Sequence, residues 1–154
     1  MAGEAAREGR RGAALGSIVG RRRQAREFAL QLLYELDVRG DTDPGPAIDA
    51  FWKRQPTQDE VRGFADTLVR GVKEHQPKID ELITRFAEHW ELDRMAVVDR
   101  NVLRAGIWEL LWGVDVPPKV AINEALEIAR RFSTTESTAF INGLLDRVRR
   151  ELCP

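Results

Sequence analysis

Four arginines lie close together near the start of the first predicted helix, at Arg21, Arg22, Arg23 and Arg26. Arg22 and Arg26 are four residues apart and therefore share one face of a helix. A guanidinium group pairs bidentately with phosphate oxygens, and the release of counterions from a nucleic acid then favours association. Cations at a helix N-terminus oppose the helix dipole, so the cluster indicates a role other than helix stability. It predicts binding to a nucleic acid, with a solvated helix start or an acidic membrane surface as the alternatives.

Two further polar positions could contact a nucleic acid. Lys119 follows two prolines and opens a predicted helix, where it could reach a phosphate or simply lie in solvent. Asn142 precedes Gly143 inside a predicted helix, although glycine is disfavoured there by about 1 kcal/mol. An Asn-Gly pair inside a helix therefore indicates a specific role for this position, either the close approach of another helix or a contact with RNA.

Trp108 and Trp112 are also four residues apart, on the most apolar predicted helix. Their spacing fits a core position, and the alternative is an aromatic surface that contacts a protein partner. An exposed apolar stripe of this kind could be covered in a homodimer or by another protein.

Catalytic and metal-binding patterns are not found in the sequence. His75 and His89 have no further histidine, cysteine or carboxylate at a recognised metal-ligand spacing. Glycine-rich phosphate loops and the Gly-x-Ser-x-Gly nucleophile motif do not occur. We therefore expect no metal, no cofactor and no enzymatic activity.

Composition and charge narrow the class of protein further. The chain has 154 residues, 32% charged and 43% hydrophobic, with a net charge of −1. Residues 1–26 carry seven arginines and two acids, so a basic segment precedes an acidic remainder, a pattern typical of polyanion binding. The single cysteine, Cys153, suits a reducing cytosol, and no apolar run is long enough to span a membrane. These features predict a cytoplasmic protein.

The elements that must position these residues are helices. Apolar residues recur with helical periodicity, and no segment alternates like a strand for long enough to predict one. The expected fold is all-α, with about seven helices: residues 22–38, 46–53, 61–72, 77–86, 93–112, 119–132 and a last helix through residue 152. Capping-box patterns at Thr57–Glu60 and Ser133–Glu136 predict two of the helix starts.

The expected domain organisation has a tail and one folded unit. Residues 1–20 lack periodicity and predict a flexible basic tail. Residues 21–154 form a single domain, with an N-terminal subdomain over about 21–75 and a C-terminal subdomain over about 76–152.

Three stretches resemble the NusB family of transcription antitermination factors. They are RRRQAREFALQLLYELD at 21–37, DRNVLRAGIWELL at 99–111 and VPPKVAINEALEIARRFSTTESTAFINGLLDRV at 116–148. The resemblance implies an all-α fold of two helical subdomains. It also implies binding to boxA, a single-stranded leader RNA element of ribosomal RNA operons, together with NusE, a small-subunit ribosomal protein. The resulting complex on RNA polymerase suppresses premature termination.

The resemblance also implies which residues contact RNA. The family's arginine-rich motif corresponds to Arg22, Arg23 and Arg26, with Arg21 as an additional basic neighbour. Lys119 corresponds to the family's lysine after the proline, and Glu136 to an acidic position at the RNA edge. Phe140 and Asn142 correspond to the family's Phe and Asn near that edge. This chain has Gln24 and Ala25 between Arg23 and Arg26, where some members carry a further basic residue.

Two other functions compete with this interpretation. One is a helical protein–protein scaffold without RNA contact. The other is a generic RNA-binding module related to the N-terminal domain of ribosomal RNA methyltransferases, although the chain contains no α/β cofactor-binding domain. A helix-turn-helix DNA-binding module fits poorly, because no compact turn precedes a polar recognition helix.

Overall fold

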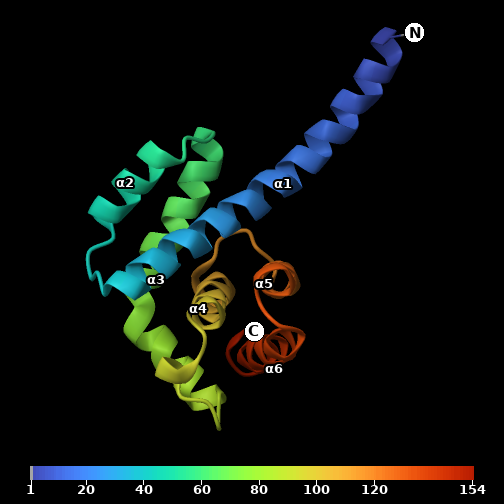
Figure 1. Cartoon of the computed structure of the whole chain (residues 1–154). Coiled ribbons are helices and arrows are strands. Elements are labelled where there is room, and N and C mark those ends of the chain that lie inside the picture. Colours follow the sequence, from blue (N-terminus) through green and yellow to red (C-terminus); the bar gives the residue numbers. More distant parts are fainter. Residues whose placement is uncertain (1) are drawn as a thin grey trace.

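Helices account for nearly all of the regular structure. The computed structural model describes the backbone of residues 2–154 and the side chains of residues 20–154. Within these residues the helices are α1 (Ala2–Arg39), α2 (Gly45–Arg54), α3 (Asp59–Phe86), α4 (Val97–Trp112), α5 (Pro118–Phe132) and α6 (Thr135–Leu152), with a short 3-10 helix, η1, at Leu92–Arg94. Figure 1 shows α1 crossing the molecule, with α2 and the first half of α3 on one side of it, and the second half of α3 with α4 to α6 on the other. The prediction of an all-α fold is confirmed, and the helix count is close to the expected seven.

α3 is one continuous helix where the sequence predicts two. Pro77 lies inside it instead of opening a new helix. A proline in a helix removes one backbone hydrogen bond, at a cost of about 3 kcal/mol. Apolar side chains are fully buried on both sides of Pro77, for example at Val72 and Ile79, and this packing offsets the loss. The expected subdomain boundary near residue 75 falls inside this helix.

α1 begins at Ala2, well before the start that the apolar pattern predicts. Residues 1–20 include five alanines, three arginines and two glutamates, which favour a helix, and five glycines, which disfavour it. The side chains of residues 1–19 lie outside the described part of the chain. The flexible basic tail over residues 1–20 therefore stays a prediction.

The buried apolar side chains form two clusters. The first joins α1, α2 and the first half of α3, with Phe28, Phe51 and Trp52 packed edge-to-face at ring-centroid distances of 4.9 to 5.9 Å. The second joins the second half of α3 to α4, α5 and α6. Trp108 packs against both clusters, so α4 connects them.

Both helix caps differ from the predicted capping boxes. Thr134, one residue after the predicted Ser133, caps α6 by accepting a hydrogen bond from the Ser137 backbone N–H at 3.0 Å. The Ser133 hydroxyl instead donates to Asp99 at 2.5 Å. α3 has Gln58 at its N-cap and no side-chain cap hydrogen bond. The three-residue spacing of a capping box in the sequence does not show which of two adjacent residues, such as Ser133 and Thr134, caps the helix.

Gly71 is the position where α3 leaves room for Trp108. A methyl group added to Gly71 would lie well inside van der Waals contact of the indole ring. We expect Gly71→Ala to lower the free energy of unfolding by about 1–3 kcal/mol, because the packed indole cannot move aside without strain. Gly63→Ala is the matched control, since it lies on the same helix, is exposed and meets nothing within 4 Å. It is expected to stabilise the protein by about 0.5–1 kcal/mol. Urea unfolding measures both, and equal effects would contradict the proposed role of Gly71.

Candidate nucleic-acid interface

The first two arginines of the cluster border a cleft between α1, α3 and the end of α4. The cleft has a volume of about 300 Å³, and Phe64 and Trp108 contribute to its lining. The exposed Arg22 guanidinium lies 4.5 Å from the centre of the Phe64 ring. Arg21 donates to Glu60 at 3.0 Å. The cleft thus combines two positive charges with aromatic surface.

Arg23 points away from this cleft, toward α5. Its guanidinium donates two hydrogen bonds of 3.2 Å to the two carboxylate oxygens of Glu124, and its side chain remains 43% exposed. The hydrogen bond and the charge of Glu124 raise the pKa of Arg23 above its usual range. Arg23 is therefore permanently charged, and half of its surface faces solvent.

Arg26 is buried, so its assignment as a phosphate-binding residue stays a prediction that requires the site to open. It donates to the two carboxylate oxygens of Glu109 at 2.8 and 3.2 Å, and the side chains are only 8% and 5% exposed. Although Arg22 and Arg26 share a helix face, α4 covers that face at Arg26 and leaves it open at Arg22. In this structure no phosphate can reach the Arg26 guanidinium.

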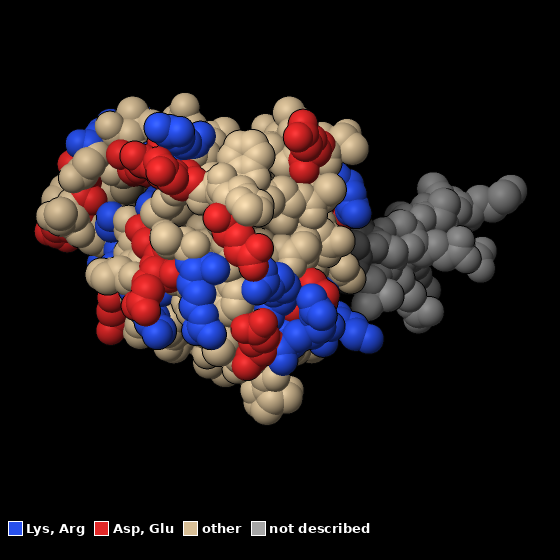
Figure 2. Space-filling model, turned by 90° about the horizontal axis from the view of Figure 1, so that it is seen from below, with Lys and Arg blue, Asp and Glu red and all other residues tan. Residues whose placement is uncertain are grey.

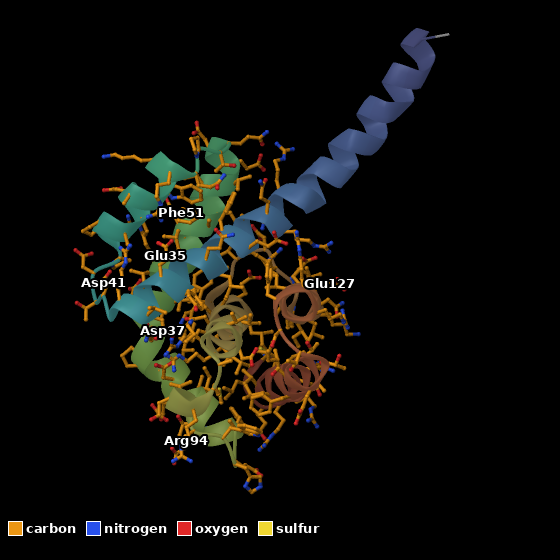
Figure 3. The ribbon with its side chains drawn as sticks, in the orientation of Figure 1. Glu35, Asp37, Asp41, Phe51, Arg94 and Glu127 are labelled. Carbon is orange, nitrogen blue, oxygen red and sulfur yellow. The ribbon has the colours of Figure 1, made fainter. Side chains whose placement is uncertain are left out.

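α5 supplies two basic residues that sequence analysis missed. Arg131 donates to Glu27 of α1 at 2.6 Å with its side chain 65% exposed, and the exposed Arg130 pairs with Glu127 at 2.7 Å. Figure 3 shows Glu127 on the side of α5 that faces away from α4. Basic residues are common at helix C-termini because they complement the helix dipole, so their presence in the sequence does not indicate a nucleic-acid contact. Only the packing of α5 on α1 places Arg131 beside the arginines of α1.

A basic surface joins α1 to α5. Arg21, Arg23 and Arg131 surround a shallow basin of about 450 Å³ that Gln24 and Gln58 also line. On the face seen in Figure 2, Lys and Arg side chains gather at the side of the molecule next to the undescribed start of α1, with acidic side chains among them. Phosphate groups would thus meet positive charge that is partly balanced by neighbouring carboxylates.

A second, polar basin follows between α5 and α6. It has a volume of about 410 Å³, and Arg130, Thr135 and Asn142 contribute to its lining. Arg130 lines this basin and Arg131 lines the first one, so both basins lie at the C-terminal end of α5. The exposed Asn142 side chain fits the predicted polar contact. Lys119 is exposed in the first turn of α5, at the opposite end of that helix.

Glu136 and Phe140 lie on another face of α6 from Asn142. They are four residues apart and share a face, whereas Asn142 is two residues further on and points to a different side. Glu136 is exposed, and Phe140 is half-buried against Trp90, with ring centroids 5.9 Å apart. The structure therefore does not bring Phe140 and Asn142 together, and it adds Trp90 beside Phe140.

The two tryptophans predicted as partner contacts have contacts within the chain. Trp108 packs on Gly71 and against both apolar clusters, and its buried indole N–H has no hydrogen-bond partner among the described residues. Trp112 is half-buried and stacks on His75, with ring centroids 4.1 Å apart and an interplanar angle of 10°. These positions fit the core alternative for Trp108, and the partner role of both residues stays a prediction.

The described part of the chain has no feature of a metal site or of a membrane-spanning helix. Within it, no group of three or more His, Cys, Asp or Glu side chains is placed to hold a metal ion. No helix there has the length and apolar character needed to cross a membrane.

Comparison with known proteins identifies the family. The sequence model of the NusB family matches residues 23–150. The chain is 49% identical over 137 residues to the transcription antitermination protein NusB of Myxococcus xanthus, with 84% of this chain and 95% of the relative covered. It is 41% identical over 140 residues to the protein of the same name from Thermodesulfovibrio yellowstonii, with 85% and 93% covered. The chain belongs to the NusB family, whose members are non-enzymatic transcription antitermination factors.

Solved structures agree with this assignment. The T. maritima NusB structure superposes with a TM-score of 0.79 at 39% identity, covering 86% of this chain and 93% of that one. A crystal structure of the antitermination factors NusB and NusE in complex with double-stranded RNA gives a TM-score of 0.75 at 25% identity, covering 84% and 96%. The resemblance inferred from the three sequence stretches is therefore confirmed at the level of family and fold.

Proposed function

We propose that this chain is a cytoplasmic RNA-binding antitermination factor that binds boxA-type leader RNA of ribosomal RNA operons together with NusE. The observation that carries the proposal is the basic surface from Arg21 and Arg23 on α1 to Arg131 on α5, with the polar basin at Asn142 lined from the same end of α5. The related NusB–NusE complex with RNA supports the same partners. This chain and NusE would act together in a complex on RNA polymerase that suppresses premature termination.

The chemistry of this surface suits a single strand. Sequence-specific RNA recognition targets unpaired bases, with phosphates held by basic side chains and base edges read by polar groups. Arg22, Arg23 and Arg131 would hold phosphates, and Asn142 would contact a base edge. Lys119 and Glu136 are further contacts expected from the family resemblance. Arg26 contributes indirectly by holding α1 against α4.

RNA binding tests the proposal directly. Fluorescence anisotropy would compare a boxA-like RNA with a scrambled RNA, each with and without NusE, across a salt series. We expect a preference for the boxA-like RNA that strengthens with NusE. Equal, steeply salt-dependent binding to both RNAs, unaffected by NusE, would instead indicate a generic polyanion surface. Absence of RNA binding with retained NusE binding would favour a protein scaffold, and size measurements would show whether the free chain is a homodimer.

The combined variant Arg22→Ala with Arg23→Ala is expected to lower RNA affinity by about 10- to 100-fold at low salt, because two charge-assisted contacts are lost. The slope of log affinity against log salt should become shallower by about 1.4, since each phosphate contact to a single strand contributes about 0.7. The same anisotropy assay measures both quantities.

The matched control removes two positive charges elsewhere. Arg39→Ala with Lys53→Ala changes exposed residues at the ends of α1 and α2. Arg39 lies about 24 Å from Arg23 along the helix axis. This control should leave the salt slope near that of the wild type. An unchanged slope in the Arg22 and Arg23 variant would remove these arginines from the RNA-binding surface.

A further inference from the structure

Among the described Phe, Tyr and Trp residues, Trp90 is the most exposed, at 53% of its surface. It ends a tight turn after α3, in which the Trp90 backbone N–H donates to the Ala87 carbonyl at 2.8 Å. Its ring lies beside Phe140 of α6, with a centroid distance of 5.9 Å and an interplanar angle of 54°. Two aromatic rings from segments 50 residues apart thus form one surface, and the indole leaves much of its area open.

The turn that carries Trp90 is fixed to α6. Arg147, seven residues after Phe140 and on the same side of the helix, donates to the Phe86 carbonyl and to Glu88, both at 3.3 Å. Its guanidinium also lies 5.2 Å from the centre of the Phe86 ring. These contacts hold the turn against the helix, so the two rings keep their relative position before any ligand arrives.

The surroundings of this aromatic pair identify the ligand chemistry. The neighbouring turn residues Glu88, His89 and Glu91 are all exposed, so the apolar area is confined to the two rings. The two carboxylates disfavour a phosphate here, and Arg147 pairs with Glu88 at 3.3 Å, so the rings would contact a base and not the RNA backbone. A stable protein interface buries about 800 Å² on each partner around a larger apolar centre. An unpaired base needs only one aromatic face for stacking and keeps its polar edges in solvent.

We propose that Trp90 and Phe140 form a stacking platform for an unpaired RNA base, which makes Trp90 a further RNA-binding residue. The inference rests on the proposed function, because the base belongs to the RNA that the arginines hold. Glu136 shares the Phe140 face of α6, so its carboxylate lies at the edge of the platform, where it could accept from a base amino group. The platform adds an RNA contact at the turn after α3, on another face of α6 from Asn142.

Trp90→Ala tests the platform. Loss of base stacking typically lowers affinity by about 5- to 100-fold per base. We expect a reduction in this range for the boxA-like RNA, with an unchanged salt slope, because stacking releases no counterions. Trp90→Phe keeps an aromatic face and should bind within about threefold of the wild type. Tyr34→Ala, at another exposed aromatic residue on α1, is the control and should leave RNA affinity unchanged.

Fluorescence and abasic RNA give two independent readouts. Trp52 is buried and Trp112 stacks on His75, whereas the half-buried Trp108 lines the Arg22 cleft and could also be quenched by bound RNA. The quenching assigned to Trp90 is therefore the part that Trp90→Phe removes while retaining affinity. An RNA that lacks the base at the stacked position should bind the wild-type protein more weakly than intact RNA does. The Trp90→Ala variant should bind the abasic and the intact RNA with equal affinity.

The outcomes separate this inference from the proposed function. If Trp90→Ala binds RNA like the wild type while the Arg22 and Arg23 variant loses affinity, the platform is wrong and the proposed function stands. If Trp90→Ala leaves RNA binding intact but weakens binding of NusE, the surface contacts protein and the inference is overturned. If the wild type binds neither RNA, both fail together. Circular dichroism and the melting temperature would establish that the Trp90 variants are folded.

Discussion

Arg26→Ala is expected to lower the free energy of unfolding by about 3–5 kcal/mol, because it leaves the Glu109 carboxylate buried without its partner. The pair joins α1 to α4 through two hydrogen bonds of 2.8 and 3.2 Å. Both side chains are almost fully buried, so water cannot replace the lost guanidinium. Urea unfolding followed by circular dichroism measures the effect.

A charge-free replacement of the same pair should behave differently. Arg26→Met combined with Glu109→Met removes both charges and retains most of the buried volume, and such exchanges are often neutral or stabilising. The double variant should therefore recover most of the stability that Arg26→Ala loses. Arg39→Ala, at an exposed position on the same helix, should change stability by no more than about 0.5 kcal/mol.

The same double variant decides whether Arg26 contacts RNA. If the role of Arg26 is to hold α1 against α4, the double variant should bind RNA with the affinity and salt slope of the wild type. A stable, folded double variant with a shallower salt slope would show that Arg26 reaches a phosphate in the complex, and the buried pair would then have to open on binding.

Helix faces could be predicted from the sequence because they depend on local periodicity. Residues 119–132 were expected to be helical, and α5 spans Pro118–Phe132. The predicted helix over 22–38 likewise places Phe28, Leu32 and Leu36 in the core, as observed. Pro77 is the exception, because its effect depends on whether tertiary packing on both sides outweighs one lost hydrogen bond.

Arginine pairing could not be predicted in the same way. Arg26 and Glu109 are 83 residues apart in sequence, and Arg23 and Glu124 are 101 apart. The cluster near residue 21 contains four similar side chains, and only the arrangement of α4 and α5 decides which is buried and which remains exposed. Trp90 shows the same limit, because its exposure beside Phe140 depends on how the turn after α3 packs against α6.

The family motif DRNVLR contributes to stability more than to the RNA-binding surface. Asp37, at the end of α1, accepts two hydrogen bonds from Arg100 at 2.7 and 2.8 Å, one from Asn101 at 2.8 Å and one from Arg104 at 2.9 Å. Arg104 also donates twice to Asp80 of α3, at 2.8 and 3.1 Å. Figure 3 shows Asp37 where the end of α1 approaches α3 and α4. Asp37 thus ties α1 to α4, and Asp80 extends the network to α3 through Arg104.

Asp37→Ala is expected to lower the free energy of unfolding by about 3 kcal/mol, because Arg104 is buried and loses a charged partner. Asp37→Asn retains the shape and one acceptor oxygen, so its loss should be smaller, about 1–3 kcal/mol. Asp49→Ala, at an exposed acid on α2, is the control and should have an effect within about 0.5 kcal/mol. Urea unfolding at pH 7 measures all three.

The pH dependence isolates the charge of Asp37. Burial alone would raise its pKa, but the hydrogen bonds from Arg100 and Asn101 and the charges of Arg104 and Arg100 outweigh burial and lower it. The folded-state pKa therefore lies below the unfolded value of about 3.9, so the carboxylate stabilises the fold fully above that pH. This contribution disappears as the pH falls from about 4 through the folded-state pKa.

The stability difference between the wild type and Asp37→Asn should accordingly be constant from pH 7 to about pH 5 and shrink below pH 4. Carboxylates that do not share an arginine with Asp37 titrate alike in both proteins, so their contribution cancels in the difference. A difference that stays constant down to pH 3 would mean that Asp37 acts through shape alone. The shrinking difference would instead establish that the negative charge of Asp37, held among Arg100, Asn101 and Arg104, is what joins α1 to α4.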